Sequence, residues 1–391
     1  MNRTNRLGRS RASIAAAIMF ASAALAPIRA QPAPTPAAAA SVTDATDRNA
    51  ALQYWQAFAE LPVPDDAQRK LISTWETAPL DATADKLLQS AADALKQLHR
   101  GSACDRCDWG LNKQDSFAMR LPHLVKARDL ARLACLRARQ RLTTGQTAAA
   151  VEDIADTLVL ARRTGADDIL IGIMVQASIE RMAINAVAPH LQTVSKDDLA
   201  HLSDRLTKLP PGGTLEGSIV WEREYGLMSL IARLQDPKSD GRRGEQWLAD
   251  TLGLPPAAIK AAGATPQTVA ARLNALRPIY DAFPEALKLP QPQAHARMLE
   301  LQRQSDDNPL KIALPDFTRA YDHYAAMQTR LTLLRAAVAI ELAGPQRLKD
   351  FTDPYSGQAL EYKPRPTGFL ILSKVTEEGQ PVTLTIGSAD K

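Results

Sequence analysis

The chain has 391 residues, of which 45% are hydrophobic and 23% charged, and its formal net charge is +4. Five of its 47 lysines and arginines, but none of its 43 acidic residues, lie in the first thirty positions. The remaining positions carry 42 basic and 43 acidic residues, so a globally basic surface of the kind that binds nucleic acid is not expected.

The first thirty residues have the order of a secretory signal peptide. Arginines precede an apolar run over residues 14–26. A short segment then ends at Ala30, and the residues that follow are rich in alanine and proline. This order is typical of a cleavable signal. We predict cleavage after Ala30 rather than Ala26, because Pro27 would follow the second cut. An uncleaved anchor is the alternative, but the run is shorter than the roughly 20 residues that span a bilayer.

Residues 31–43 are rich in alanine and proline and are predicted to form a disordered linker. The most apolar later run, residues 169–175, is much shorter than a membrane span. We therefore expect no stable membrane insertion after signal cleavage, and a periplasmic or secreted protein.

Helices are predicted through most of residues 44–344, because apolar residues recur at three and four positions. An apolar stripe over residues 124–142, a second around residues 151–158 and an apolar helix over residues 169–188 follow one another with short turns, so they should pack as antiparallel neighbours. The first two of these helices, joined by a short turn, resemble a tetratricopeptide hairpin at most, and no second copy follows at a fixed period. The predicted class is mainly α, an irregular antiparallel helical array with a small C-terminal antiparallel β-sheet.

A proline- and glycine-rich link at residues 209–213 is the predicted boundary between two helical subdomains. The N-terminal subdomain covers residues 44–209 and the C-terminal subdomain residues 214–345. The second should begin with a helix over residues 215–234, followed by an exposed turn over residues 238–244.

Shorter helices come next, broken at Pro255-Pro256, Pro266 and Pro284. A last long helix begins near Phe317 and carries aromatic and apolar residues at a spacing close to 3.5 as far as Val338. This helix is predicted to be the structural spine of the domain.

The composition changes again over residues 346–391. Strands are predicted over residues 360–363, 369–372 and 382–386, with turns between them. A sheet this small does not stand alone, so it should pack on the helical body.

Two segments carry a resemblance to known proteins. Cys107-Asp108-Trp109-Gly110-Leu111, followed by Leu121-Pro122-His123-Leu124 and an arginine- and leucine-rich helix, resembles a group of exported, uncharacterised bacterial helical proteins. The tail from Asp353-Pro354-Tyr355-Ser356-Gly357 resembles the terminal sheet of type II secretion pseudopilins. The signal region lacks a prepilin cleavage sequence, and the tail lacks the run of acidic ligands of a calcium site. The resemblances imply an exported helical protein with a C-terminal hairpin, but no activity.

Cys104 and Cys107 lie in a polar segment between two predicted helices. In an exported chain this spacing predicts a short-loop disulfide. A redox role would need a thioredoxin-like strand and helix, which the surrounding pattern does not predict. A zinc site is the alternative, because His99 and His123 flank the pair and would complete a tetrahedral ligand set. Cys135 falls on the apolar stripe and is predicted to be a small buried side chain.

Two pairs of acidic residues stand out. Glu222 and Glu224 lie beside Trp221 and Tyr225, and acids near aromatic rings could form a sugar-binding or hydrolytic cleft. Residues two apart, however, point to different sides of a helix. The acidic pair at residues 167–168 is predicted to cap the helix that follows.

The sequence contains no HExxH, GxSxG, P-loop or dinucleotide-binding pattern. Our leading hypothesis is an exported helical scaffold that binds a protein or peptide in the cell envelope, through a groove between helices and without a cofactor. The alternatives are a hydrolase-like enzyme and a small-ligand or metal-binding protein centred on Cys104 and Cys107. A closed pocket containing several of the candidate residues would favour an enzyme. Those residues are His99, Cys104, Cys107, His123, Glu222 and Glu224.

Overall fold

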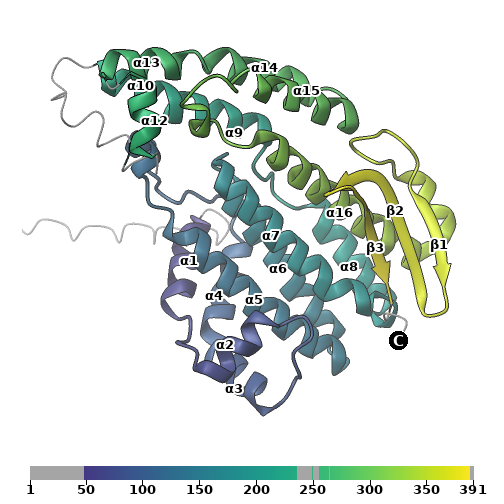
Figure 1. Ribbon diagram of the computed structural model, residues 1–391. Coiled ribbons are helices and arrows are strands. Elements are labelled where there is room, and N and C mark those ends of the chain that lie inside the picture. The colour runs from purple at the N-terminus through teal and green to yellow at the C-terminus, as the bar shows by residue number, and fades with distance from the viewer. Residues whose placement is uncertain (1–47, 236–248, 250–254, 264, 388–391) are drawn as a thin grey trace, which may run out of the picture. The chain divides into compact units, whose positions relative to one another are not determined.

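The computed structural model describes residues 48–235, 249, 255–263 and 265–387 (Figure 1). The predicted signal peptide, the linker over residues 31–43 and the turn over residues 238–244 lie outside the described residues. The described part is mainly α-helical and ends in a small antiparallel sheet, which confirms the predicted fold class.

The first helices are α1 (Ala50–Ala59), α2 (Asp66–Ser73), α3 (Ala82–Ser90) and α4 (Ala92–Ser102), followed by the short 3-10 turn η2 (Lys113–Ala118). Asn49, Asp65 and Asp81 precede the first three helices, and each side chain accepts a hydrogen bond from a backbone N–H of the first turn. These caps satisfy donors that have no partner inside the helix, so the polar residues at these positions fix where the helices begin.

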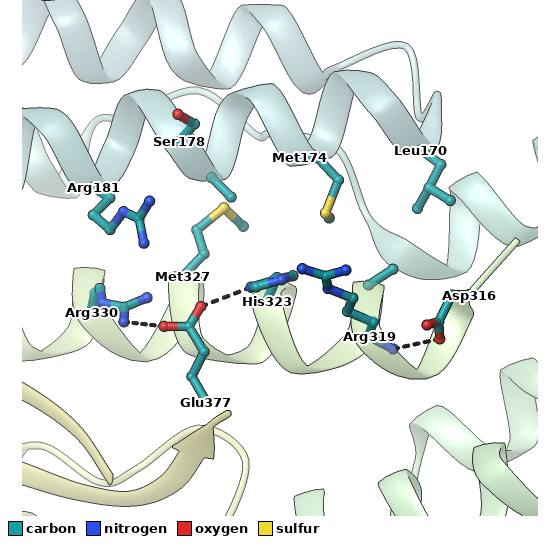
Figure 2. A pocket seen from close by; sticks show the side chains of 12 residues that line it. Leu170, Met174, Ser178, Arg181, Asp316, Arg319, His323, Met327, Arg330 and Glu377 are labelled. Carbon is teal, nitrogen blue, oxygen red and sulfur yellow. Dashed lines mark hydrogen bonds and ion pairs between the residues drawn. The ribbon is translucent and has the colours of Figure 1, made fainter. Parts of the chain in front are cut away.

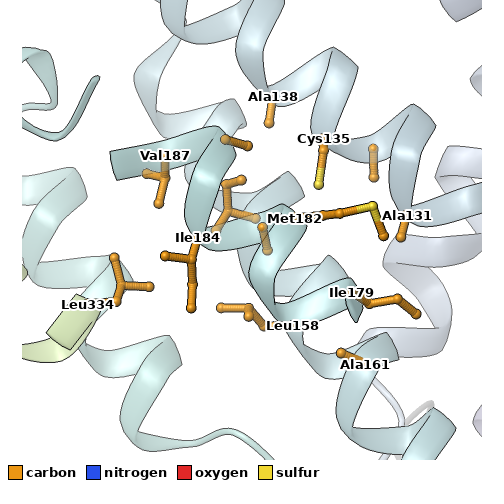
Figure 3. Close-up of a cluster of buried hydrophobic side chains, with 14 of the residues drawn as sticks. Ala131, Cys135, Ala138, Leu158, Ala161, Ile179, Met182, Ile184, Val187 and Leu334 are labelled. Atoms are coloured by element: carbon orange, nitrogen blue, oxygen red, sulfur yellow. The ribbon is translucent and has the colours of Figure 1, made fainter. Parts of the chain in front are cut away.

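Three helices form the centre of the array. They are α5 (Pro122–Thr143), α6 (Thr147–Gly165) and α7 (Leu170–Val187), and each contacts the other two as predicted. Figure 3 shows Ala131, Cys135 and Ala138 of α5 with Ile179 and Met182 of α7 in the buried cluster. Alanine and cysteine are small, so they allow close approach of the helices. Cys135 is fully buried, as its position on the stripe predicted.

Trp109 is the residue that anchors the segment at residues 107–111 to the helices around it. Its indole N–H donates a hydrogen bond to the Arg163 carbonyl at 2.9 Å. Its ring lies 5.7 Å from that of Tyr54, 6.1 Å from that of Phe58 and 4.6 Å from that of His123, measured between centroids. The segment therefore joins α1, α5 and α6 through an aromatic cluster.

After α7 come the 3-10 turn η3 (Ala188–Thr193) and α8 (Lys196–Thr207). The helix predicted over residues 215–234 consists of α9 (Leu215–Trp221), a π-helical turn η4 (Glu222–Met228) and α10 (Ser229–Gln235). A π turn is uncommon and often marks a functional site. The sequence pattern did not predict it.

The remaining helices are α12 (Pro256–Ala261), α13 (Pro266–Asn274), α14 (Arg277–Leu287), α15 (Gln291–Arg303), η5 (Lys311–Ala313), α16 (Phe317–Ala343) and η6 (Pro345–Asp350). Pro256 and Pro266 begin helices, as predicted. The predicted break at Pro284 is wrong, because α14 continues through it. Pro284 lies three residues before the end of α14, so it removes one backbone hydrogen bond near the C-terminus without ending the helix.

Buried apolar side chains of the described residues form two clusters. The first core lies among α1 to α8, most of α16 and the sheet, whereas the second core lies among α9 to α15 and the start of α16. Phe317 and Tyr321 of α16 belong to the second core and Leu334 to the first, so α16 is part of both. Contacts group Thr43–Lys391 into one unit. The subdomain boundary at residues 209–213 stays a prediction.

The sheet of the described chain contains β1 (Glu361–Arg365), β2 (Gly368–Glu377) and β3 (Gln380–Ile386), antiparallel and in that order. All three predicted strands are present, and β2 extends beyond its predicted end. Ile371 pairs with Leu384 across β2 and β3, and both side chains are buried. The sheet lies beside α16 in Figure 1 and contributes to the first core.

The segment Leu170–Thr193 is long and apolar enough to cross a membrane by length and composition. The expectation that no later segment approaches that length was therefore wrong, because the apolar pattern continues beyond residue 175. The central part of this segment is α7, which packs on α5, α6 and α16. A buried core helix passes the same test of composition, so membrane insertion of this helix is not implied.

Candidate functional site

A cavity of about 440 Å³ lies between α7 and α16. Leu170, Met174, Ala177, Ser178 and Arg181 line it from α7, at the three- and four-residue spacing that places side chains on one helix face. From α16 and its cap come Asp316, Arg319, Ala320, His323, Met327 and Arg330, and Glu377 comes from the end of β2. Figure 2 shows these side chains around the space between the two helices.

Glu377 joins the sheet to α16 at one side of the cavity. Its carboxylate lies 2.9 Å from Nδ1 of His323 and also forms an ion pair with Arg330. Burial raises the pKa of Glu377, but the hydrogen bonds from Arg330 and His323 outweigh burial and hold the pKa below its ordinary value. The carboxylate is therefore ionised at neutral pH, and its charge is already compensated.

Two other arginines of the cavity, unlike Arg330, have no ion-pair partner among the described residues. Arg181 and Arg319 are exposed, and within the described residues neither guanidinium has a hydrogen bond or ion pair. The carboxylate of Asp316 accepts from the backbone N–H of Arg319 at 3.0 Å and does not neutralise its side chain. The cavity thus holds two guanidinium groups whose donors remain available to an anion.

The remaining wall is apolar. Leu170, Met174, Met327, Ala177 and Ala320 provide it, and the two methionines adapt to differently shaped partners. A cavity with an apolar wall and a few convergent polar groups suits a small amphipathic ligand. The free donors are cationic, so the geometry favours a ligand with an anionic group.

The same cavity contains the parts of a general base. His323 is oriented by Glu377 through Nδ1, which leaves Nε2 for another partner. Ser178 also lines the cavity, but no hydrogen bond joins its hydroxyl to His323 among the described residues. A nucleophile and base need such contact in the reacting complex.

None of the six candidate residues from the sequence lines this cavity or the two others described below. Cys104 is buried, and its Sγ donates to the Arg100 carbonyl at 3.4 Å. Burial raises the pKa of Cys107 to about 12, although Arg163 acts in the opposite direction. A thiol with so high a pKa is a poor nucleophile at neutral pH. No two cysteines of the described chain lie at disulfide distance, and the predicted disulfide stays a prediction.

His99 and His123 lie in different surroundings. His123 is buried and stacks on Trp109, and burial lowers its pKa to about 4. His99 Nδ1 lies 2.8 Å from the Asp156 carboxylate, whose hydrogen bond raises the His99 pKa. The structure does not gather the zinc ligand set predicted from these histidines and the two cysteines.

A different group could hold a metal. Ligand atoms of His99, Glu152 and Asp156 lie within 4.8 Å of one another, and the described chain contains no other such group of three. Arg205 already pairs with both carboxylates, at 3.0 Å from Asp156. Because the arginine compensates both charges, an ion-pair network accounts for this cluster without a metal.

Glu222 and Glu224 do not share a cleft. Glu222 is buried, and burial raises its pKa to about 7, while the Leu170 backbone N–H that it accepts from lowers it. Glu224 is exposed and pairs with Arg223 at 2.7 Å. Glu222 thus accepts a hydrogen bond at the buried start of α7, whereas Glu224 forms an ion pair at the surface.

Asp167 and Asp168 do not cap α7 as predicted. Ile169 precedes the helix, and no side chain caps it. Asp168 has a positive φ of 56°, and its carboxylate accepts from the Thr214 backbone N–H at 2.6 Å instead. The turn therefore aims this side chain at the start of α9 rather than at α7.

A second cavity, of about 620 Å³, lies beside the loop between α1 and α2. Val63, Ile72 and Leu133 give it apolar walls, and Lys126 stands among them. Val63 is 94% exposed, so the cavity is a surface depression. No feature of the described chain indicates what would cover it.

The chain matches no protein-family model, no curated protein and no solved structure. The site therefore has to be judged from its own geometry. The sequence missed Arg181, Arg319, Arg330 and Glu377. Arg181, a charged residue in a mostly apolar helix, is the one local signal, and it does not point to the other three residues.

Proposed function

We propose that this chain is an exported binding protein that holds a peptide-like ligand in the cavity between α7 and α16. The guanidinium groups of Arg181 and Arg319, which have no partner among the described residues and lie in a partly apolar cavity, carry this proposal. They would take the carboxylate of the ligand, and Met174 and Met327 would contact its apolar side chain. The groove between helices that the sequence suggested is consistent with this role.

Titration calorimetry with N-acetyl-leucyl-methionine tests the proposal, with the free acid compared with its amide. The free acid should bind at least tenfold more tightly, because a hydrogen bond to a charged group contributes about 1.5–3 kcal/mol. Arg181→Met together with Arg319→Met should remove this preference, since methionine keeps the apolar stem but not the charge. Equal binding of acid and amide by the wild type would contradict the proposal.

Arg347→Met is the matched control. Arg347 is exposed, pairs with Asp350 at 2.9 Å and lies outside the cavity. This variant should bind the free acid as the wild type does. A similar loss in the control and in the double variant would show that the effect is general surface charge.

Export is the second part of the proposal, and the N-terminal sequence pattern supports it. The protein recovered from the periplasm of an expressing bacterium should have a mass that begins at Gln31. A mass that includes residues 1–30 would contradict cleavage. The same spectrum, recorded with and without reductant, reports whether two cysteines have lost their hydrogens.

A further inference from the structure

A third cavity, of about 390 Å³, lies where the turn before α7 meets α9. Asp167 and Asp168 line it from the turn, Glu216 and Trp221 from α9, Tyr225 from the π turn and Lys113 from η2. It shares no lining residue with the cavity between α7 and α16. Its chemistry is also the opposite, since three acids face one lysine.

Two of these acids, Asp167 and Glu216, have no direct partner in the described part of the chain. Asp167 is half-buried, and within the described chain its carboxylate has no hydrogen bond or ion pair. Burial raises its pKa, which Lys113 partly offsets. Glu216 is exposed and likewise has no hydrogen bond or ion pair there. A cation that entered the cavity would relieve the unfavourable burial of the Asp167 charge.

Asp168 is built into the wall. Thr214 holds its carboxylate, and an added Cβ at Gly217 would come within 2.2 Å of a carboxylate oxygen. Only glycine leaves room for this carboxylate so close to α9. The position of Asp168 is thus fixed by neighbours that belong to the fold.

The opposite wall is aromatic. The rings of Trp221 and Tyr225 lie 5.6 Å apart between centroids, and Tyr225 is 39% exposed. Trp221 is only 7% exposed, and its indole N–H has no hydrogen-bond partner among the described residues. Ser116 donates to the Tyr225 carbonyl and ties the π turn to η2. Such ring faces attract cations.

We infer that this acidic and aromatic cavity binds an organic cation, of the ammonium or guanidinium class that lysine and arginine side chains of a peptide present. Carboxylates supply the charge, and the ring of Tyr225 supplies a face on which a planar guanidinium stacks. A bare metal ion would use the carboxylates but not the rings. The organic cation therefore fits both walls.

Acetyl-arginine amide and acetyl-citrulline amide test this inference as a pair, because citrulline keeps the shape and lacks the charge. The full chain, labelled with 5-fluorotryptophan, gives a resonance that Trp221→Phe assigns. Acetyl-arginine amide should shift this resonance in a saturable manner, and acetyl-citrulline amide should bind at least fivefold more weakly. Asp167→Asn and Tyr225→Leu should each weaken the binding of acetyl-arginine amide at least threefold.

Glu224→Gln is the matched control, since Glu224 is an exposed acid near Tyr225 in sequence that does not line the cavity. It should bind the arginine probe as the wild type does. Equal binding of arginine and citrulline probes, or calcium chloride shifting the Trp221 resonance while the arginine probe does not, would overturn the inference. Arg181→Met with Arg319→Met should leave this binding intact, so the two sites fail or succeed separately.

Discussion

His123 shows how one buried side chain makes stability depend on pH. Its ring is stacked on Trp109 in the aromatic cluster, at 4.6 Å between centroids, and is almost fully buried. Burial disfavours the charged form and lowers the pKa from 6.5 to about 4. Between these two values the unfolded chain binds a proton that the folded chain does not.

The unfolding free energy should therefore fall as the pH drops from 6.5 to about 4, by up to about 3 kcal/mol from this residue. His123→Phe keeps an aromatic ring and removes the titration. As the pH falls through this window, the unfolding free energy of the variant should increase relative to that of the wild type. Urea denaturation at a series of pH values measures it.

His99 makes the unfolding free energy depend on pH in the opposite direction. Both the wild type and His123→Phe contain His99, so its contribution cancels in the difference between them. Asp156 raises the His99 pKa, so its contribution is present below the unfolded value and is lost as the pH rises through the folded one. A difference curve for His123→Phe that stays flat from pH 7 to pH 4 would mean that His123 is protonated in the folded chain.

At the scale of elements, Asp353 joins the turn before β1 to strand β2. Its carboxylate accepts from the backbone N–H groups of Tyr355 at 2.9 Å and Ser356 at 3.0 Å, and from the hydroxyl of Ser373 in β2. It is 1% exposed. The Asp-Pro-Tyr-Ser-Gly segment is thus a turn that a buried carboxylate organises.

Asp353→Ala should lower the unfolding free energy by about 2–4 kcal/mol, because it leaves several buried donors without an acceptor. Asp350→Ala is the control: Asp350 makes a surface ion pair with Arg347, and such pairs contribute at most about 1 kcal/mol. Urea denaturation of both variants gives the comparison. Equal losses would mean that Asp353 has no special role in holding the sheet.

Local patterns predicted elements well where one physical signal dominated. The stripe over residues 124–142 predicted α5, since periodicity records which face is buried, and short runs bounded by turns predicted the strands. Pro284 misled, because the cost of a proline depends on where in a helix it falls. Asp168 also misled, since its positive φ turns the carboxylate away from α7.

The candidate sites could not be predicted in the same way. Arg181, Arg319 and Glu377 lie far apart in sequence, and only the packing of α7, α16 and β2 brings them to one cavity. Cysteines and histidines drew attention because of their spacing, whereas the structure places them in the core or in ion pairs. Trp221 and Tyr225 were noticed, but two of the three acids that line the cavity with them, Asp167 and Asp168, come from the turn before α7.

At the scale of the whole described unit, α16 is the element that couples the two cores. Its first turns place Phe317 and Tyr321 in the second core, and Ala325 onward belongs to the first. Because α16 buries side chains in both cores, loss of one core removes tertiary contacts that hold this helix in place for the other. We therefore predict that both cores unfold in one cooperative transition, rather than as separate subdomains divided at residues 209–213.

Hydrogen exchange measured by mass spectrometry tests this prediction. Phe317→Ala removes a fully buried ring from the second core and should lower stability by about 3–5 kcal/mol. If α16 couples the cores, the slowest amides of α5 in the first core and of α14 in the second should gain exchange by the same factor. Faster exchange in α14 alone, with α5 unchanged, would instead establish the two subdomains as independent folding units.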